Sequence, residues 1–462
     1  MENKDLLANI AKVDKATEKT KNFINSLVDQ GSFVETDVFM AGKCFDDATE
    51  ALGEGVVTGY ATINGNPIQI FAQNAEVLKG SLSAAHAEKI NKCISRAVNS
   101  KTPLVSIIDS CGARVGEGAS VMEGYAKIIA ASTELNGYVP HICVVKGVSV
   151  GLMSSFVASA DFVFMSKDAV MSVNSPMYLV SGLKNFPVDY KEQLGFKAYK
   201  AKSDLAHFTY KDEADLSSQL TKLIDAISDT DANIEEDDPN RVDPSLESMD
   251  AVEAVKVIAD KNSVISYCPD YAADVDCSIA KVNGITVGFI ATKGDYITSD
   301  GLTKATNFVK KLDNNEIPLI TLVDTKGIDT NLESELSGIA KKSYNLIAAV
   351  ATSEIAKIGV AFGNAIGYGY TALMSKALGF GYTLATSNSK ISPVSEEVAV
   401  AMMCDQLKAE KKTENLQKVS QKYADMQLNP VNAAKDGYVD NVIEATNLRP
   451  YIASALLMLL GL

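Results

Sequence analysis

Glycine-rich turns follow several short apolar runs of this 462-residue chain, and they are its clearest candidates for chemistry. The run "PLVSII" ends in "DSCGAR" at residues 109–114, and the run "PLITLV" ends in "DTKGID" at residues 324–329. Two further turns, "KGVSVGLMSS" and "GNAIGYGYT", also lead into helix-like segments. A turn of this kind presents free backbone N–H groups at the positive end of a helix dipole. It can bind a phosphate, or it can stabilise negative charge that develops on a thioester or urea oxygen.

Other chemistry finds less support in the sequence. The glycine-rich stretch "GEGVVTG" at residues 53–59 precedes a strand rather than a helix, so it is not a dinucleotide fingerprint, and no phosphate-loop motif is present. The three histidines form no ligand-spaced cluster and the seven cysteines include no CxxC pair, so no metal site is expected. Close helix packing explains a single glycine turn, whereas four turns in matching positions favour stabilisation of an anion.

The elements that must position these turns occur twice. Matched residues keep a nearly constant separation: 219 for Gly65 and Gly284, 215 for Asp109 and Asp324, 216 for Gly151 and Gly367, and 217 for Pro176 and Pro393. Such a register over more than a hundred residues indicates two copies of one domain. Each copy reads as hairpin, helix, buried strand, glycine turn, helix, buried strand, glycine turn and helix. This alternation predicts an α/β fold with right-handed β-α-β connections.

The boundary between the copies falls in "SDTDANIEEDDPNRVDPSLES", which is acidic and contains proline. Such a composition is typical of a solvated linker. We therefore expect an N-terminal domain over residues 1–230, an acidic linker over 231–250 and a C-terminal domain over 251–462.

Composition excludes several classes of protein. A net charge of −15 argues against a nucleic-acid surface, which needs a basic stripe. The charged start "MENKDLLANIAK" lacks the apolar core of a signal peptide, and the longest apolar stretch, "YIASALLMLLGL", is too short to cross a bilayer. The scattered cysteines fit a reducing compartment, so we expect a cytoplasmic protein.

A resemblance to a known family runs almost from end to end of the chain. It rests on the segments quoted above and on "GEGVVTGYATINGNPIQIFAQN", "KGSLSAAHAEKI", "SDLAHF", "AIGYGYTALMSK" and "NAAKDGYVDNVIEATNLRPYIASAL". The chain resembles the carboxyltransferase (β-type) subunits of biotin-dependent acyl-CoA carboxylases, the propionyl-CoA carboxylase β type. The same family includes the carboxyltransferase subunits of sodium-pumping acyl-CoA decarboxylases. The resemblance implies two tandem crotonase-like (ClpP/crotonase) domains, in agreement with the repeat.

The resemblance also implies an activity. A carboxyl group moves between carboxybiotin, held by a separate biotin carboxyl carrier protein, and a short-chain acyl-CoA of the propionyl-CoA or acetyl-CoA type. The thioester enolate and the biotin each need an oxyanion hole, but no side-chain base is required. The N-terminal domain would take the acyl-CoA and the C-terminal domain the biotin. Implied partners are the carrier protein and a biotin carboxylase or membrane decarboxylase subunits, together with further copies of the chain. In this family the site forms between halves of different subunits, commonly in a hexamer.

By resemblance, the catalytic N–H groups map onto Gly151 and Leu152 for the thioester and onto Tyr368 and Gly369 for the biotin. The implied binding residues along these sites are Lys79, Gly80, Ser81, Cys111, Gly112, Ala113, Arg114 and Gly367. The family usually has glycine where Leu152, Tyr368 and Cys111 stand, and alanine where Gly369 stands. Any residue except proline keeps the N–H donor, so these departures need not destroy either hole, although bulky side chains could narrow the pockets. Thr371 lies where the family tunes acyl-chain preference, so the acyl group is left open.

Alternative functions stay open at this point. The subunit could decarboxylate methylmalonyl-CoA or a similar thioester in a biotin-dependent sodium pump, or it could be a divergent, non-catalytic scaffold subunit. A crotonase-type hydratase or hydrolase would need a carboxylate pair, for which Glu117 and Glu123 are the nearby candidates.

Several single residues have two interpretations each. Arg114 could bind CoA phosphates or form an internal salt bridge. Asp109 could be a functional carboxylate, but an Asp at the end of a strand is expected to cap the following helix. His207 could border the site or serve packing.

Overall fold

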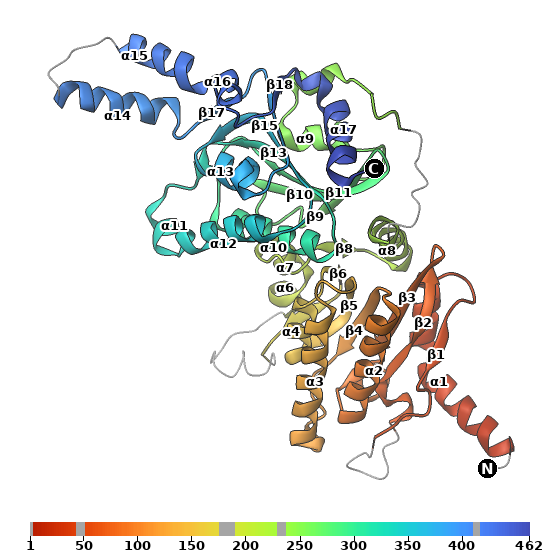
Figure 1. Cartoon of the computed structure of the whole chain (residues 1–462). Helices are drawn as coiled ribbons and strands as arrows, with labels where there is room; N and C mark the ends of the chain where they lie inside the picture. Colours follow the sequence, from red (N-terminus) through yellow and green to blue (C-terminus); the bar gives the residue numbers. More distant parts are fainter. Residues whose placement is uncertain (1–2, 43–50, 175–189, 229–236, 410–415) are drawn as a thin grey trace. The chain divides into compact units, whose positions relative to one another are not determined.

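The computed structural model describes residues 3–42, 51–174, 190–228, 237–409 and 416–462. The chain divides into two compact units, Met1–Ser228 and Asp229–Leu462. The first unit therefore ends two residues before the expected boundary at residue 230. Figure 1 labels most of the elements of both units and colours the chain from its N-terminus to its C-terminus.

The first unit is a sheet of mixed direction covered by helices. Its strands run in the order β1-β2-β3-β4-β5-β6-β8, with β7 paired to β5; β1 to β3 are antiparallel and all other pairs are parallel. The strands are β1 (Val34–Thr36), β2 (Val56–Ile63), β3 (Asn66–Gln73), β4 (Leu104–Ser110), β5 (His141–Val150), β6 (Phe162–Ser166), β7 (Val170–Ser172) and β8 (Phe208–Tyr210). The α-helices are α1 (Asn3–Leu27), α2 (Ala84–Ser100), α3 (Ala119–Leu135), α4 (Leu152–Ala158), α6 (Tyr190–Leu194), α7 (Phe196–Lys202) and α8 (Glu213–Ile227).

The second unit repeats this topology. Its main sheet has the order β18-β16-β15-β13-β11-β10-β9, with β17 paired to β15, which is the first order read in reverse. Its strands are β9 (Ile265–Tyr267), β10 (Val275–Val282), β11 (Ile285–Thr292), β13 (Leu319–Thr325), β15 (Lys357–Ile366), β16 (Tyr382–Thr386), β17 (Lys390–Ser392) and β18 (Asn441–Ile443), besides a separate pair of β12 (Tyr296–Ile297) and β14 (Gly327–Ile328). Its α-helices are α9 (Ala251–Ile258), α10 (Ser299–Asn314), α11 (Leu332–Leu336), α12 (Ile339–Thr352), α13 (Tyr368–Met374), α14 (Glu396–Ala409), α15 (Leu416–Tyr423), α16 (Pro430–Lys435) and α17 (Leu448–Leu460). The predicted internal repeat is thus a repeat of two sheets and their crossover helices.

Local sequence explains how the crossover helices begin. The Ser83 side chain caps α2 by accepting from the backbone N–H of His86, and Thr298 caps α10 by accepting from that of Gly301. An oxygen-bearing side chain at this position stabilises a helix by about 1 kcal/mol. Both helices follow a hairpin and return the chain to a parallel strand, as a right-handed crossover requires.

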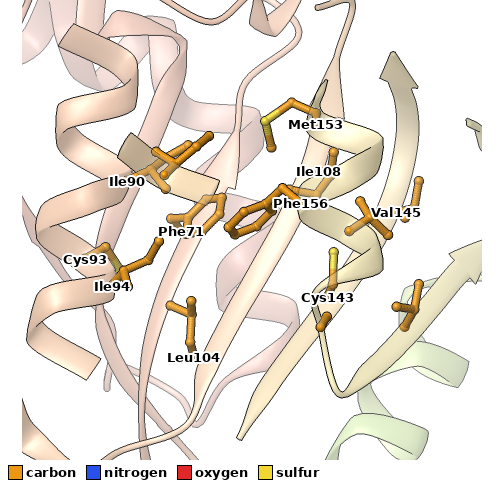
Figure 2. Close-up of a cluster of buried hydrophobic side chains, with 14 of the residues drawn as sticks. Phe71, Ile90, Cys93, Ile94, Leu104, Ile108, Cys143, Val145, Met153 and Phe156 are labelled. Atoms are coloured by element: carbon orange, nitrogen blue, oxygen red, sulfur yellow. The ribbon is translucent and has the colours of Figure 1, made fainter. Parts of the chain in front are cut away.

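The core of the first unit lies between β3 to β5 and helices α2 and α4. Figure 2 shows Phe71 and Phe156 in contact at its centre, and their ring centroids are 6.0 Å apart. Ile90, Leu104 and the other side chains of this cluster are withdrawn from water. Each large apolar side chain buried in this way contributes about 1.5–3 kcal/mol of transfer free energy. The core therefore fixes α4, whose first residue carries a predicted catalytic N–H group.

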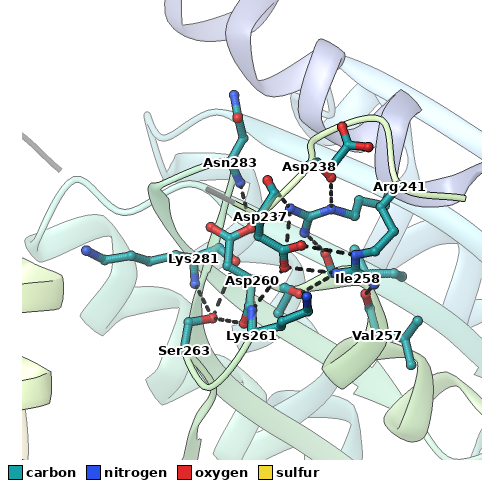
Figure 3. A network of polar contacts seen from close by, with 12 residues as sticks. Asp237, Asp238, Arg241, Val257, Ile258, Asp260, Lys261, Ser263, Lys281 and Asn283 are labelled. Atoms are coloured by element: carbon teal, nitrogen blue, oxygen red, sulfur yellow. Dashed lines mark hydrogen bonds and ion pairs between the residues drawn. The ribbon is translucent and has the colours of Figure 1, made fainter. Parts of the chain in front are cut away.

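In the described part of the expected linker, residues 237–250, Asp237 and Leu246 are buried and seven of the fourteen residues are exposed. Arg241 lies between the Asp237 carboxylate and the backbone carbonyls of Val257 and Ala259 (Figure 3). The α17 residue Arg449 is 1% exposed; it donates to the carbonyls of Asp237 and Asp238 and pairs with Asp260 at 2.6 Å. The Asp237 carboxylate thus pairs with half-buried Arg241 at 3.1 Å and with buried Arg449 at 3.7 Å. Residues 237–250 thus belong to the second unit.

Candidate functional site

The parallel strands at the centre of each unit have an irregular register where the glycine turns begin. Ile108 of β4 is opposite Val145 of β5, whereas Ser110 is opposite Ser149. A single residue, Asp109, therefore faces three residues of β5. The second unit has the same irregularity, because Val323 is opposite Ala361 and Thr325 is opposite Ala365. Bulges of this kind redirect a strand end and are frequent next to active sites.

Gly151 makes the turn from β5 into α4. Its φ of +76° is in the region that favours glycine, and its N–H donates to the carbonyl of Ser172 at 2.9 Å. Leu152 is the first residue of α4, and Ser154 makes the first bond of the helix to Gly151. The N–H of Leu152 has no intrahelical partner and donates to no group in the described part of the chain. Of the two predicted donors, Gly151 is therefore engaged, whereas Leu152 has no acceptor among the described residues.

The "DSCGAR" turn passes beside this helix start. A Cβ on Gly112, whose φ is +108°, would lie 3.5 Å from the carbonyl oxygen of Val150. The turn is held by backbone bonds to the segment that follows β3: the Cys111 N–H donates to Lys79 at 3.1 Å, and the Leu82 N–H donates to Gly112 at 2.9 Å. The structure thus brings together the predicted residues Lys79, Gly80, Ser81, Cys111, Gly112, Ala113, Arg114 and Gly151.

Arg114 forms an internal salt bridge, which is one of the two roles that its sequence context suggested. Its guanidinium pairs with Glu54, whose side chain is fully buried, and with Glu117 at 3.3 Å. It also donates to the carbonyl of Ser81 at 3.4 Å. Lys79, by contrast, has an exposed side chain beside the same turn. Arg114 therefore holds the turn from inside, and Lys79 is the cation that faces solvent there.

Glu117 and Glu123, the candidate carboxylates for a hydratase or hydrolase, have different surroundings. Glu117 accepts from Arg114 and, at 2.9 Å, from the N–H of Ala84, so both of its oxygens have partners. Glu123 is exposed on α3. The structure therefore engages Glu117 in an internal network and leaves Glu123 on the surface.

The second unit builds the corresponding turn at Gly367. Gly367 has a φ of +52°, its N–H donates to Ser392 at 2.9 Å, and Tyr368 begins α13. Within the described residues the Tyr368 N–H, like that of Leu152, has no acceptor. A Cβ on Gly369 would lie 2.3 Å from Cγ2 of Thr325, so this buried position excludes a side chain. Gly369 thus serves close packing of α13 against β13.

The two bulky departures from the family pattern are oriented differently. The hydroxyl of Tyr368 donates to the carbonyl of Ser343 in α12 at 2.7 Å, and burial raises its pKa. The Tyr368 ring is therefore tied back onto α12. The Leu152 side chain, by contrast, is 44% exposed.

Buried ionisable groups lie behind the first turn. Burial raises the pKa of the Asp109 carboxyl, while the hydrogen bond from the Val148 N–H and the charge of Lys146 oppose this shift. Burial lowers the pKa of His86 to about 3, assisted by the charges of Lys89 and Arg114. His86 is therefore a neutral imidazole whose Nε2 lies 3.3 Å from Nε2 of Gln73.

Asp109 and His207 each accept a hydrogen bond from the backbone of a neighbouring strand. The prediction that Asp109 caps the following helix is wrong, because its carboxylate accepts from the N–H of Val148 in the β5 bulge at 3.1 Å. The register of β5, which brings Val148 to Asp109, is not visible in the sequence. His207 accepts from the N–H of Val163 at 2.9 Å, which is the packing role of its two interpretations.

Sequence reasoning missed Glu54, Gly147 and Gly363. Gly147 and Gly363 each stand four residues before the turn glycine of their unit, and this shared spacing was the available signal. The run "GVSVG" at 147–151 also matches the GxSxG nucleophile pattern, but Ser149 is buried within β5 and not on a strand-to-helix turn.

The comparisons with known proteins agree with this geometry. The family model described as the carboxyl transferase domain matches residues 17–460. Mitochondrial propionyl-CoA carboxylase beta chain of Homo sapiens is 29% identical over 452 residues, which cover 93% of this chain and 83% of that protein. Methylmalonyl-CoA decarboxylase subunit alpha of Veillonella parvula is 30% identical over 456 residues, covering 94% and 88%.

Solved structures match the whole fold. The crystal structure of transcarboxylase 12S, a hexamer with hydrolysed methylmalonyl-coenzyme A bound, superposes with a TM-score of 0.92 at 26% identity and covers 99% of this chain and 95% of that one. None of the described helices has the length and apolar character needed to span a membrane. The fold is the crotonase-like α/β fold, and the chain belongs to the carboxyl transferase family as an acyl-CoA carboxyltransferase of the biotin-dependent class.

Proposed function

We propose that the chain is the subunit that moves a carboxyl group between carboxybiotin on a carrier protein and a short-chain acyl-CoA of the propionyl-CoA or acetyl-CoA type. The observation that carries this proposal is the matched pair of helix starts, Leu152 on α4 and Tyr368 on α13, each with an available N–H. A reaction through an enolate needs such donors and no side-chain base.

The thioester site would be built by the first unit. The Leu152 N–H would donate to the thioester oxygen as it takes up the charge of the enolate. The Cys111–Arg114 turn beside it would line the CoA, and exposed Lys79 would face the CoA phosphates. Arg114 would act indirectly, since its guanidinium is occupied by Glu54 and Glu117.

The second unit would receive the biotin. Bound biotin supplies a ureido group that carries the carboxyl between the two half-reactions. The Tyr368 N–H would donate to the ureido oxygen at the start of α13. The contact of the Tyr368 hydroxyl with Ser343 fits this role, because it turns the ring toward α12 and leaves the helix start accessible.

The assembly would be a homo-oligomer, commonly a hexamer, as in the transcarboxylase 12S structure, and a biotin carboxyl carrier protein would be its partner. Its direction depends on the other partners. The similarity to a methylmalonyl-CoA decarboxylase subunit supports the second candidate, decarboxylation in a biotin-dependent sodium pump, to the same extent as the similarity to propionyl-CoA carboxylase supports the first.

The test is decarboxylation of malonyl-CoA or methylmalonyl-CoA by the purified chain with free biotin, followed by chromatography of the acyl-CoA product. We expect turnover that requires biotin, and the preferred thioester identifies the substrate. Leu152→Pro removes the N–H at a helix position where proline is tolerated, and it should lower kcat by about 10²–10³-fold. Leu152→Ala keeps the N–H and is the matched control. No turnover by a folded oligomer would favour the scaffold alternative instead.

A further inference from the structure

Asp109 and Asp324 occupy the same place in the two units. Each is the last residue but one of a central strand, β4 or β13, and each faces the bulge of the next parallel strand. Neither residue is needed to carry the anion chemistry described above. Their surroundings nevertheless share three features: the carboxylate accepts from a backbone N–H of the bulge, the residue's own N–H donates to a side-chain oxygen, and a glycine packs on the carboxylate.

Asp109 is joined to its neighbours on two sides. Its Oδ1 accepts from the Val148 N–H at 3.1 Å, and its own N–H donates to Oε1 of Gln73 at 3.1 Å. Gly147 packs directly on the carboxylate, because a Cβ there would lie 2.3 Å from Oδ1 of Asp109. On its far side, a Cβ on Gly80 would lie 2.1 Å from the Asp109 carbonyl oxygen. The loop after β3, the end of β4 and the bulge of β5 therefore meet at this residue.

Asp324 repeats the arrangement with different partners. Its Oδ1 accepts from the Asn364 N–H at 2.7 Å, and its own N–H donates to Oγ1 of Thr292 at 2.7 Å. A Cβ on Gly363 would lie 2.4 Å from Oδ1 of Asp324. The Gly294 N–H donates to the Asp324 carbonyl at 2.6 Å. The side chains around the two aspartates differ, yet the geometry is retained.

The bulge that each carboxylate holds leads directly into a turn glycine. Gly147 stands four residues before Gly151, and Gly363 stands four residues before Gly367. A carboxylate that fixes the bulge therefore fixes where the following helix start points its N–H. Displacements of about 1 Å in such a donor are enough to cost about 10²-fold in rate.

We propose that Asp109 and Asp324 are positioning residues, each of which sets the N–H of one helix start: Asp109 that of Leu152 and Asp324 that of Tyr368. The assignment of one aspartate to the thioester and the other to the biotin rests on the proposed function. Neither carboxylate contacts the reacting atoms. Each acts through the backbone of the strand bulge it binds.

The experiment measures the biotin-dependent decarboxylation of malonyl-CoA or methylmalonyl-CoA with each substrate varied in turn. Asp109→Ala should lower kcat/KM for the thioester by about 10-fold or more, and Asp324→Ala should do so for free biotin while leaving CoA-thioester binding by calorimetry unchanged. Asp109→Asn and Asp324→Asn keep an oxygen that can accept from the bulge, so they should recover most of the loss. Asp168→Ala, at an exposed aspartate, is the control.

The outcomes separate positioning from general stability. Equal losses toward both substrates in both alanine variants, or no loss in either, would overturn the proposal. If the alanine variants do not fold, wild-type rates and selectivity in both asparagine variants would support it, and equal losses toward both substrates would overturn it. If the wild type shows no turnover, the proposed function fails by itself. Hydrogen exchange then decides: Asp109→Ala should accelerate exchange at residues 147–153 and spare 363–369, and uniform acceleration would refute the positioning role.

Discussion

The ion pair between Glu54 and Arg114 offers a quantitative test of how the turn at residues 109–114 is held. The Glu54 side chain is fully buried; it accepts from Arg114, from the hydroxyl of Ser83 and, at 2.7 Å, from the N–H of Gly42. Glu54→Gln keeps the shape but leaves the Arg114 charge with Glu117 alone at 3.3 Å. Removing one partner of a buried pair costs about 3–5 kcal/mol. Because Glu117 remains, we expect the free energy of unfolding to fall by the lower figure, about 3 kcal/mol.

A double-mutant cycle isolates this interaction. Glu54→Gln, Arg114→Met and the double variant are unfolded in urea, and hydrogen exchange in α2 follows the first unit separately. The coupling energy should be about 1.5–3 kcal/mol, since the two groups are in direct contact. Glu88→Gln removes a partner from the exposed pair with Lys127, at 3.9 Å, and should cost less than about 1 kcal/mol. Additive losses, or a Glu54→Gln effect no larger than that of Glu88→Gln, would refute the reasoning.

Three further predictions concern the surrounding structure. The pKa of His86 is about 3 in the folded chain and 6.5 for an unperturbed histidine. Between these values the unfolded chain binds a proton at His86 that the folded chain does not, so the free energy of unfolding decreases as pH falls below 6.5. His86→Gln should therefore reduce the acid loss by up to about 1.4 kcal/mol per pH unit in urea unfolding at pH 7 and 5, and an unchanged slope would contradict this. Gly369→Ala would place its Cβ against Cγ2 of Thr325 and should reduce turnover at least about 10-fold. Adding Thr325→Ser removes that methyl group and should restore part of the turnover. If the double variant is no faster than Gly369→Ala, this contact is not the cause of the loss. Arg449→Met leaves Asp260 buried without its cation and should lower the unfolding free energy by about 3–5 kcal/mol, and a loss under about 1 kcal/mol would show that the pair is dispensable.

Much of the fold could be predicted because the two copies share glycines at positions where the backbone requires a positive φ. Gly151 and Gly367 need positive φ, and the hairpins at Gly65 and Gly284 need it as well. Such positions keep their spacing even where the side chains around them differ. The alternation of short apolar runs and helical segments then identified the parallel strands between them.

The internal contacts of the site could not be predicted in the same way. Glu54 reaches Arg114 from a backbone with a φ of +60°, a conformation that nothing in the local sequence requires. Asp109 meets Gly147 only because the register of β4 and β5 shifts between Ile108 and Ser110. Residues 237–250 look like a solvated linker because their charge partner, Arg449, is more than 200 residues away in the sequence. Each of these contacts depends on long-range pairing.

The same distinction bears on the unusual residues at the two helix starts. Leucine at 152 and tyrosine at 368 would be expected to impair an oxyanion hole if its side chains decided its function. An N–H donor, however, is supplied by every residue except proline, and its direction is set by the backbone behind it. In this chain that backbone depends on Gly147 and Gly363, where a single methyl group would meet a carboxylate oxygen at 2.3 to 2.4 Å. Function should therefore tolerate change at 152 and 368 more readily than at 147 and 363, although the proposed donors stand at 152 and 368.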